Sequence, residues 1–434
     1  MARDGARRFL FVLPDAGGNA PPTVALAGRL AQRGYLVRVL GHRSLQARFE
    51  AVGCRFTAFR RAPDNDTSSP LTDLVKDWEV RSPLAQFARV RDRLLFGPAL
   101  AFARDVLEEI EHHDTDVAVV DVMLPGAALG AERAAVPTAV LVHTIYLIPA
   151  PGIPPVGLGL RPAAGPLGAA RDRVIGGLSL RVMATGLPRL NEARAALGLG
   201  PLAHTFDQLL AVDRVLVLTN RRFDFPARSL PPSVRYVGPQ FDDQGEPGWD
   251  LPWPEYGSEP LVLVSLSSTF QDQAPTIRAI MAALDGLAVR ALVTLGPTLD
   301  PATFHPPPNV VVLPIVPHAA VLPSARVVVT HGGHGTVMKA LAHGVPLVCL
   351  PFGRDQADVA RRVVEAGAGL RLSRRSSPHR LRAAVAQVLV ETRFRRAAAT
   401  LAEAIAAEAA GDPAVAELER LAARAGPPAV GDAT

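Results

Sequence analysis

Two histidines lie among three glycines in "HGGHG", which opens at His331 within the stretch "THGGHGTVMKALAHG". The apolar run "VVVT" precedes them, and a helical pattern that ends at Gly344 follows, so the glycines form a strand-to-helix turn. Glycines allow close approach to the backbone, and the amides at the start of a helix bind anions. The turn therefore predicts a phosphate site made of His331 and the first amides of the helix.

A second polar pair, Asp355 and Gln356, opens the next helical pattern after the apolar run "LVCLP". A carboxylate beside an amide can accept from neighbouring hydroxyls and donate to another oxygen, a combination that suits a sugar ring. Taken singly, a glycine turn is often structural and an Asp is often an N-cap. The order and spacing of the two features instead favour a nucleotide sugar. A zinc site from His331, His334 and His343 is the alternative, but its spacing matches no common zinc pattern.

Apolar runs alternate with helical patterns in both halves of the chain. The runs are "FLFVL", "LVRVLG", "RFTAF", "VAVVD" and "TAVLVHT", then "LVLVSL", "ALVTLG", "VVVLP", "VVVTH" and "LVCLP". This alternation predicts an α/β fold of two doubly wound, Rossmann-like domains that face a central cleft. Because ligands bind at the carboxyl ends of parallel strands, we expect Asp121, His143, residues 265–269 and His331 to face that cleft.

The composition changes between Pro226 and Pro260, where proline, glycine and acidic residues predominate. Such a stretch is typical of an interdomain linker. We therefore expect an N-terminal domain at residues 1–225, a linker at 226–259, a C-terminal domain at 260–405, and a final helix and tail at 406–434.

The overall composition describes a globular protein. Of 434 residues, 48% are hydrophobic and 20% are charged, the net charge is +5, and the arginines form no long basic run, so nucleic-acid binding is not expected. Two cysteines are too few for a disulfide framework. We find no apolar run long enough for a membrane span or a signal peptide. A cytoplasmic location is therefore predicted.

The chain resembles the family 1 glycosyltransferases of the GT-B fold, particularly actinobacterial enzymes that glycosylate natural products. In the C-terminal half the similar segments are "VSLSST", "IVPHAAVLP", "VVVTHGGHGT", "ALAHGVPLV" and "FGRDQADVA". In the N-terminal half they are "PPTVALAGRLAQRGYLVRVLG" and "VAVVDVMLPGAALGAERAAVPTAVLVHT". The resemblance covers nearly the whole chain.

The resemblance implies a metal-independent enzyme that uses a nucleotide-diphosphate sugar as co-substrate and needs no cofactor. Fixed donors at the diphosphate would stabilise the charge that grows on the leaving group. Asp355 and Gln356 would bind the sugar hydroxyls. The residues implied for the base and the diphosphate are Ser267, Ser268, Val316, His318, His331, Gly333, His334, Gly335 and Thr336.

Two positions depart from the family pattern. Lys339 stands where members that use UDP-sugars often have a ribose-binding glutamate, and a charged lysine cannot accept hydrogen bonds. A dTDP-sugar, which lacks the 2′-hydroxyl, is therefore favoured over a UDP-sugar.

The second departure is Asn19, which stands where the family has its catalytic histidine. An amide is no base, so another group must take the acceptor proton. We expect a carboxylate to do so, Asp15 first and Asp121 second, acting on an acceptor that is already acidic, with His143 as the alternative.

The acceptor site is expected in two variable stretches, residues 60–102 and 145–170, whose aromatic residues would line an apolar pocket. These are Trp78, Phe87, Phe96 and Tyr146. The predicted function is transfer of a hexose, favoured to be a deoxy sugar, from a dTDP- or UDP-sugar to a hydrophobic polyketide, enediyne or macrolide aglycone. A homodimer is left open.

Three other functions are considered. A glycosyltransferase acting on lipid-linked cell-wall intermediates would need a basic and apolar membrane face. A non-catalytic homologue that activates a partner transferase would have no need of Asp355 and Gln356. A dinucleotide-dependent oxidoreductase is disfavoured because "DAGGNA" lacks the G-x-G-x-x-G spacing.

Overall fold

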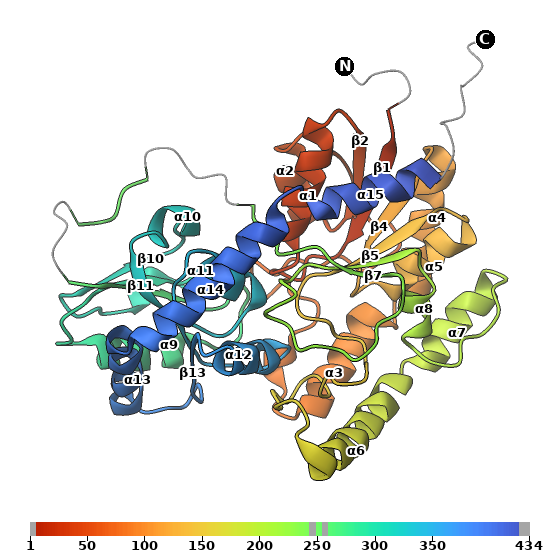
Figure 1. The fold of residues 1–434 in the computed structure, drawn as a ribbon. Helices are drawn as coiled ribbons and strands as arrows, with labels where there is room; N and C mark the ends of the chain where they lie inside the picture. Colours follow the sequence, from red (N-terminus) through yellow and green to blue (C-terminus); the bar gives the residue numbers. More distant parts are fainter. Residues whose placement is uncertain (1–5, 243–248, 254–258, 425–434) are drawn as a thin grey trace.

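The computed structural model describes residues 6–242, 249–253 and 259–424. These residues form two parallel β-sheets with helices on both faces, one sheet from each half of the chain (Figure 1). The α/β fold with two doubly wound domains is therefore confirmed. In the same described residues, no helix is both long and apolar enough to cross a membrane.

The first sheet, as far as the described residues show it, has seven parallel strands in the order β3-β2-β1-β4-β5-β6-β7. The order reverses between β1 and β4, and the loops after these two strands open a crevice at their carboxyl ends. The strands are β1 (Arg8–Leu13), β2 (Leu36–Gly41), β3 (Arg55–Ala58), β4 (Val117–Asp121), β5 (Thr138–Val142), β6 (Arg214–Val217) and β7 (Val234–Tyr236).

Helices cover both faces of this sheet because its strands alternate apolar side chains to either side. From β1, Phe9, Phe11 and Leu13 pack on one face, and Leu10 and Val12 pack on the other. The helices of this half are α1 (Ala20–Gln32), α2 (Gln46–Glu50), α3 (Pro83–Val90), α4 (Ala99–His112), α5 (Pro125–Arg133), α6 (Gly165–Ala184), α7 (Leu187–Ala196) and α8 (Asp207–Leu210).

The second sheet, within the described residues, has six parallel strands in the order β10-β9-β8-β11-β12-β13. Its strands are β8 (Leu261–Ser265), β9 (Arg290–Thr294), β10 (Val310–Leu313), β11 (Ala325–Thr330), β12 (Leu347–Cys349) and β13 (Gly369–Arg371). Its helices are α9 (Ala274–Leu284), α10 (His318–Val321), α11 (His334–Ala342), α12 (Gln356–Glu365) and α13 (Pro378–Val390). Strands β8 and β11 are central, so the loops that follow them meet at the middle of the sheet edge.

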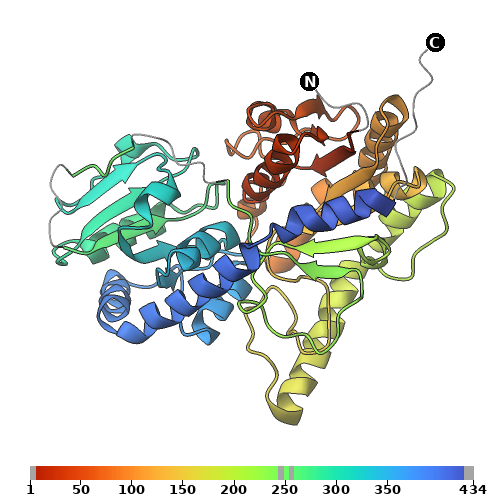
Figure 2. The ribbon, with the colours of Figure 1, turned by 45° about the horizontal axis from the view of Figure 1, so that its top comes forward.

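The chain returns to the first domain at its end. Helix α14 (Thr392–Ala409) packs on α11, and α15 (Pro413–Arg424) packs on α1 (Figures 1 and 2). Between them, Asp412 accepts from Arg29 and Arg33 of the first domain, at 3.2 and 3.1 Å. The two domains are therefore tied together on the side away from the loops that follow the strands.

The interval expected as a linker, residues 226–259, contains β7, which pairs with β6 and extends the first sheet. Residues 243–248 and 254–258 of that interval, and residues 425–434 of the expected tail, lie outside the described residues. Strands β6, β7 and β13, which are four, three and three residues long, are not among the apolar runs identified from the sequence.

Candidate active site between the two sheets

A cavity of about 2730 Å³ lies between the two domains. This volume is several times the roughly 300–1,000 Å³ of a site for one small ligand, so two substrates have room. The predicted site residues that line it are Asp15, Asn19, His143, Ser267, Ser268, Val316, His318, His331, Gly333, His334, Gly335, Thr336, Asp355 and Gln356. The remaining one, Asp121, lies directly behind Asn19 and His143.

The start of α11 forms one wall of this cavity. Gly333 is its N-cap residue, and no side chain caps the first turn. Gly332 adopts φ 88°, a conformation that glycine reaches without strain. A Cβ atom on Gly333 would lie 2.5 Å from Nε2 of His331. The glycines are therefore required by the turn itself, and the first amides of α11 are available to an anion.

His331 is buried beside this turn. Desolvation, and secondarily the charge of Arg354, lowers the pKa of His331 to about 3. The imidazole is therefore neutral at physiological pH, and it can contribute a hydrogen bond rather than a positive charge to a bound diphosphate.

His334 has a different surrounding, although it begins the same helix. Its Nε2 lies 2.8 Å from Oγ1 of Thr219 in the first domain, and burial lowers its pKa to about 3. The side chain thus ties α11 to the other domain, while its backbone amide belongs to the helix start. In the described residues, no group of three His, Cys, Asp or Glu side chains lies close enough to hold a metal ion.

The loop after β8 lies beside the start of α11, because β8 and β11 are neighbouring strands. The hydroxyl of Ser267 accepts from Nε2 of Gln271 at 2.6 Å and from the amide of Thr269 at 3.1 Å, so it holds the loop together. Ser268 is exposed and lines the cavity.

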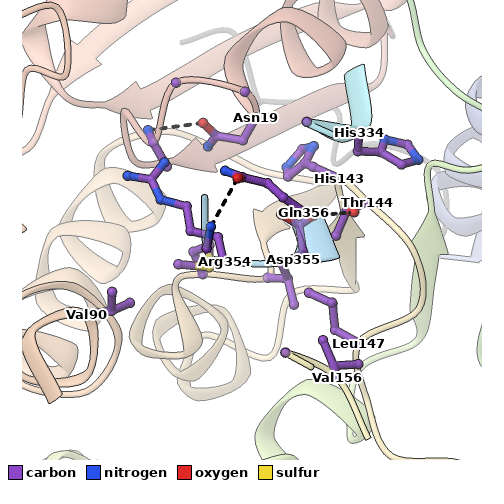
Figure 3. A pocket seen from close by; sticks show the side chains of 18 of the residues that line it. Asn19, Val90, His143, Thr144, Leu147, Val156, His334, Arg354, Asp355 and Gln356 are labelled. Carbon is purple, nitrogen blue, oxygen red and sulfur yellow. Dashed lines mark hydrogen bonds between the residues drawn. The ribbon is translucent and has the colours of Figure 1, made fainter. Parts of the chain in front are cut away.

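Asp355 and Gln356 have unequal hydrogen-bonding situations (Figure 3). Oδ2 of Asp355 accepts a 2.5 Å hydrogen bond from Oγ1 of Thr144, which follows β5 in the other domain. Gln356 is buried; its Oε1 accepts from the amide of Phe352 at 2.8 Å and its Nε2 donates to Gln271 at 2.9 Å. Gln356 thus stabilises the loop before α12 with both atoms of its amide. In Asp355 the contact with Thr144 uses one carboxylate oxygen, Oδ2, and the carboxylate also has a second oxygen, Oδ1.

A polar cluster lies at the carboxyl ends of β4 and β5, and Figure 3 labels two of its members, Asn19 and His143. Oδ2 of Asp121 accepts from Nδ2 of Asn19 at 2.6 Å and lies 3.0 Å from Nε2 of His143. Oδ1 of Asp121 accepts from the amide of Met123 at 2.8 Å. Despite the short distance to Asp121, neither ring nitrogen of His143 makes a hydrogen bond of good geometry with any described residue. The carboxylate is thus oriented, and the imidazole beside it keeps its hydrogen-bonding capacity.

Asp15, by contrast, uses both carboxylate oxygens for hydrogen bonds to its own loop and to the segments that follow β2 and β3. Oδ1 accepts from Oγ1 of Thr67 at 2.7 Å and from the amide of Gly17 at 3.1 Å. Oδ2 accepts from Oγ of Ser44 at 2.8 Å and from the amide of Thr67 at 3.2 Å. With two donors on each oxygen, the carboxylate of Asp15 has no acceptor position left for the proton of a substrate.

The loop that is expected to bind the nucleobase follows β10. Val316 is buried, and Nε2 of His318 lies 3.2 Å from Oγ of Ser265. On α11, Nζ of Lys339 donates to Oδ1 of Asp242 at 3.1 Å. Both members of this pair line the cavity.

The apolar part of the cavity is formed mainly by the first domain. Trp78, Phe87 and Phe96 line it, as the sequence predicts. Tyr146 does not; it is fully buried in the core beneath β5, so the prediction for this residue is wrong. Helix α6 contributes Leu178 and Leu180, which are exposed within the opening.

Sequence reasoning missed Arg354, which precedes Asp355. It adopts φ 53°, unusual for a residue other than glycine. Its Nε and Nη2 donate to both oxygens of Asp77 at 2.9 and 3.2 Å, and its Nη1 lies 3.3 Å from Oγ1 of Thr269. Because Asp77 is 277 positions away, no local pattern could have revealed the pair.

Comparison with known proteins identifies the family. Residues 278–421 match the C-terminal domain of erythromycin biosynthesis protein CIII-like proteins. Over 425 residues the chain is 33% identical to 4'-demethylrebeccamycin synthase of Lentzea aerocolonigenes, covering 96% of this chain and 100% of that protein. It is also 33% identical over 199 residues to demethyllactenocin mycarosyltransferase of Streptomyces fradiae, covering 43% and 42% of the two chains.

Solved structures agree with this assignment at the level of the fold. A calicheamicin glycosyltransferase superposes with a TM-score of 0.75 at 23% identity, over 96% of this chain and 99% of that one. The kitacinnamycin glycotransferase gives 0.73 at 24% identity, over 97% and 100%. The chain therefore belongs to the family 1 glycosyltransferases of the GT-B fold. It is a nucleotide-sugar-dependent glycosyltransferase of the type found in natural-product biosynthesis.

Proposed function

We propose that this enzyme transfers a deoxygenated hexose from a dTDP-sugar to an apolar natural-product acceptor, without a metal ion. The observation that carries the proposal is the content of the cavity: the start of α11 with His331, the carboxylate of Asp355, and His143 all border it, and Asp121 lies behind His143. The cavity thus has a group for the leaving diphosphate, a group for the sugar and a group that can take the proton of the acceptor substrate.

The preference for a dTDP-sugar over a UDP-sugar rests on Lys339, which replaces a carboxylate that could accept from two ribose hydroxyls. Two proteins of similar fold support it: one glycosyltransferase was solved with dTDP, at 21% identity and a TM-score of 0.68. A spinosyn rhamnosyltransferase was solved with thymidine diphosphate, at 20% identity and 0.66. The preference for a deoxygenated sugar is supported by Thr144, which donates to one oxygen of Asp355. The carboxylate then needs fewer hydroxyls from the sugar.

Metal independence is supported by the positive potential at the diphosphate subsite. The amides at the start of α11 point toward the cavity, where a helix dipole favours negative charge. The guanidinium of Arg354 is close enough to influence His331. Such fixed groups can stabilise a leaving diphosphate in the way that a bound cation would.

The acceptor is expected in the apolar part of the cavity, between Trp78 and Phe87 on one side and α6 on the other. Support comes from the names of the relatives, which include 4'-demethylrebeccamycin synthase and an aklavinone 7-beta-L-rhodosaminyltransferase. A polycyclic or macrocyclic aglycone fits this volume and polarity.

For the proton acceptor we prefer His143 to Asp15, which reverses the order expected from the sequence. Asp15 is surrounded by donors, whereas His143 faces Asp121 and has unused ring nitrogens. In the reaction, the acceptor atom attacks the anomeric carbon and gives its proton to His143. The bond from that carbon to the diphosphate oxygen breaks, and the nucleoside diphosphate leaves with the electron pair, close to His331 and the α11 amides.

The test is a matrix of dTDP- and UDP-sugars against aromatic polyketide, enediyne and macrolide aglycones, with and without EDTA, read by mass spectrometry. We expect a glycosylated product from a dTDP-sugar, unchanged by EDTA. A protein that binds no nucleotide sugar, or that turns over only with added metal, would contradict the proposal. A product formed only from a lipid-linked acceptor would assign the cell-wall function instead.

A further inference from the structure

An ion pair joins the end of the first domain to the helix at the nucleotide site. Oδ1 of Asp242 accepts from Nζ of Lys339 on α11 at 3.1 Å, and Oδ2 lies 3.3 Å from Nη2 of Arg48, just inside α2 of the first domain. The Asp242 and Lys339 side chains are 23% and 16% exposed. Both residues line the cavity. The two contacts thus hold the carboxylate of Asp242 beside α11, at the wall of the substrate cavity.

The position of this carboxylate along the nucleotide follows from the sheet order. Asp355, the residue expected to bind the sugar, follows β12, and the diphosphate site follows β11. The loop expected to bind the nucleobase follows β10, at the opposite edge of the sheet. The nucleoside must therefore extend from the start of α11 away from α12. Lys339 lies five residues beyond His334, which is about 7.5 Å along the helix axis. Because Asp242 and Lys339 both line the cavity on this side of the diphosphate site, the pair can face the sugar of the nucleoside.

The chemistry of the pair differs from that of a lone lysine. A charged lysine only donates hydrogen bonds, whereas the O–H group of a nucleoside hydroxyl needs an acceptor for the hydrogen bond that it donates. A carboxylate has about four acceptor positions, and Lys339 and Arg48 occupy one on each oxygen of Asp242. About two acceptor positions remain, one on each oxygen, and the single free hydroxyl of 2′-deoxyribose, at the 3′ position, needs one of them.

We propose that Asp242, held by Lys339 and Arg48, binds the 3′-hydroxyl of the nucleoside and replaces the acceptor that Lys339 cannot provide. The assignment deepens the proposed function and rests on it, since it requires that a nucleoside diphosphate occupies this cavity. Lys339 acts as a positioning residue, because it reaches the nucleotide through Asp242.

The experiment compares dTDP with 2′,3′-dideoxythymidine diphosphate by calorimetric titration of the full chain. The wild-type protein should bind the dideoxy nucleotide at least tenfold more weakly, because the carboxylate then faces no hydroxyl. Asp242→Ala should lose at least tenfold in affinity for dTDP and bind both nucleotides equally. Comparing two ligands within one protein removes any general effect of the substitution on folding.

Asp412→Ala is the matched control. Like Asp242, Asp412 pairs with two basic side chains, here Arg29 and Arg33 of the first domain, but it does not line the cavity. We expect this variant to weaken both nucleotides by the same factor, or neither, and to keep the preference for dTDP. Equal loss of both nucleotides in Asp242→Ala would overturn the inference and leave Asp242 a domain-bridging ion pair. A wild-type protein that binds neither nucleotide would overturn the proposed function itself.

Discussion

Nδ2 of Asn19 donates a 2.6 Å hydrogen bond to Oδ2 of Asp121, the same oxygen that lies 3.0 Å from Nε2 of His143. Asn19 also donates to the carbonyl of Pro14 and accepts from the amide of Ala16. The residue at the position of the family's catalytic histidine is therefore part of the scaffold. The acid that orients a histidine is retained, and an imidazole reaches it from the neighbouring strand.

If His143 takes the acceptor proton, His143→Ala should lower kcat by about 10²–10⁴-fold, the usual contribution of a positioned base. The cavity left by the ring should admit exogenous imidazole, which should restore part of the activity. Single-turnover kinetics with and without imidazole measure both effects. Full activity in His143→Ala would exclude the role.

Asp15→Asn tests whether Asp15, the catalytic base expected from the sequence, or His143, the base that the contacts favour, takes the acceptor proton. The substitution retains one oxygen but replaces an acceptor of several hydrogen bonds with a donor, so we expect unfolding to become easier by about 1–3 kcal/mol. Turnover of the folded protein should change less than tenfold. Thermal unfolding and kinetics on the same sample decide the matter. A stable variant with kcat reduced as far as in His143→Ala would instead establish Asp15 as the base.

The apolar strand runs, the glycine turn and the Asp-Gln pair were sufficient to predict the fold and a set of site residues of which all but Asp121 line the cavity. Buried parallel strands and helix starts have strong local signals. Pairings across the domains have none. Arg354 with Asp77, Thr144 with Asp355 and Lys339 with Asp242 each join residues far apart in the chain, and the sequence gives no rule for them. Which carboxylate is free and which is enclosed by donors, as at Asp15, is likewise a property of the folded loop.

Asp355→Ala should weaken binding of a dTDP-sugar by at least tenfold and leave the affinity for dTDP almost unchanged. The reason is that its carboxylate borders the cavity beyond the diphosphate site and, through Thr144, is already arranged to accept from a hydroxyl. Competition binding with both ligands measures the difference. Thr144→Val serves as a milder control that keeps the carboxylate but removes its protein donor. Equal losses for sugar nucleotide and nucleotide would assign Asp355 to the nucleotide or to the start of α12.

Acidification should destabilise the fold through His331 and His334. Burial lowers the pKa of each to about 3 in the folded protein, while a histidine in the unfolded chain has a pKa near 6.5. Between these values the unfolded chain binds more protons, so stability falls as the pH decreases from about 6.5 toward 3. Each histidine contributes on the order of 2 kcal/mol of this loss at pH 5. Denaturant unfolding at pH 7.5 and 5 should show a smaller difference for His331→Asn than for the wild type; an identical difference would contradict the assignment.

The preference between nucleotides is the last test, and it depends on Lys339. We expect the wild type to bind dTDP more tightly than UDP, because Lys339, which donates to Asp242 and cannot accept, stands where a carboxylate could accept from the 2′-hydroxyl of UDP. Lys339→Glu should narrow or reverse this preference, since a second carboxylate can then accept from the 2′-hydroxyl of UDP. The new charge would lie next to Asp242, so a lower melting temperature should accompany the change, and Lys339→Met is the control that removes the lysine without adding an acceptor. Calorimetric titration of both nucleotides into all three proteins gives the result. Equal affinity for dTDP and UDP in the wild type would show that Lys339 does not set the preference.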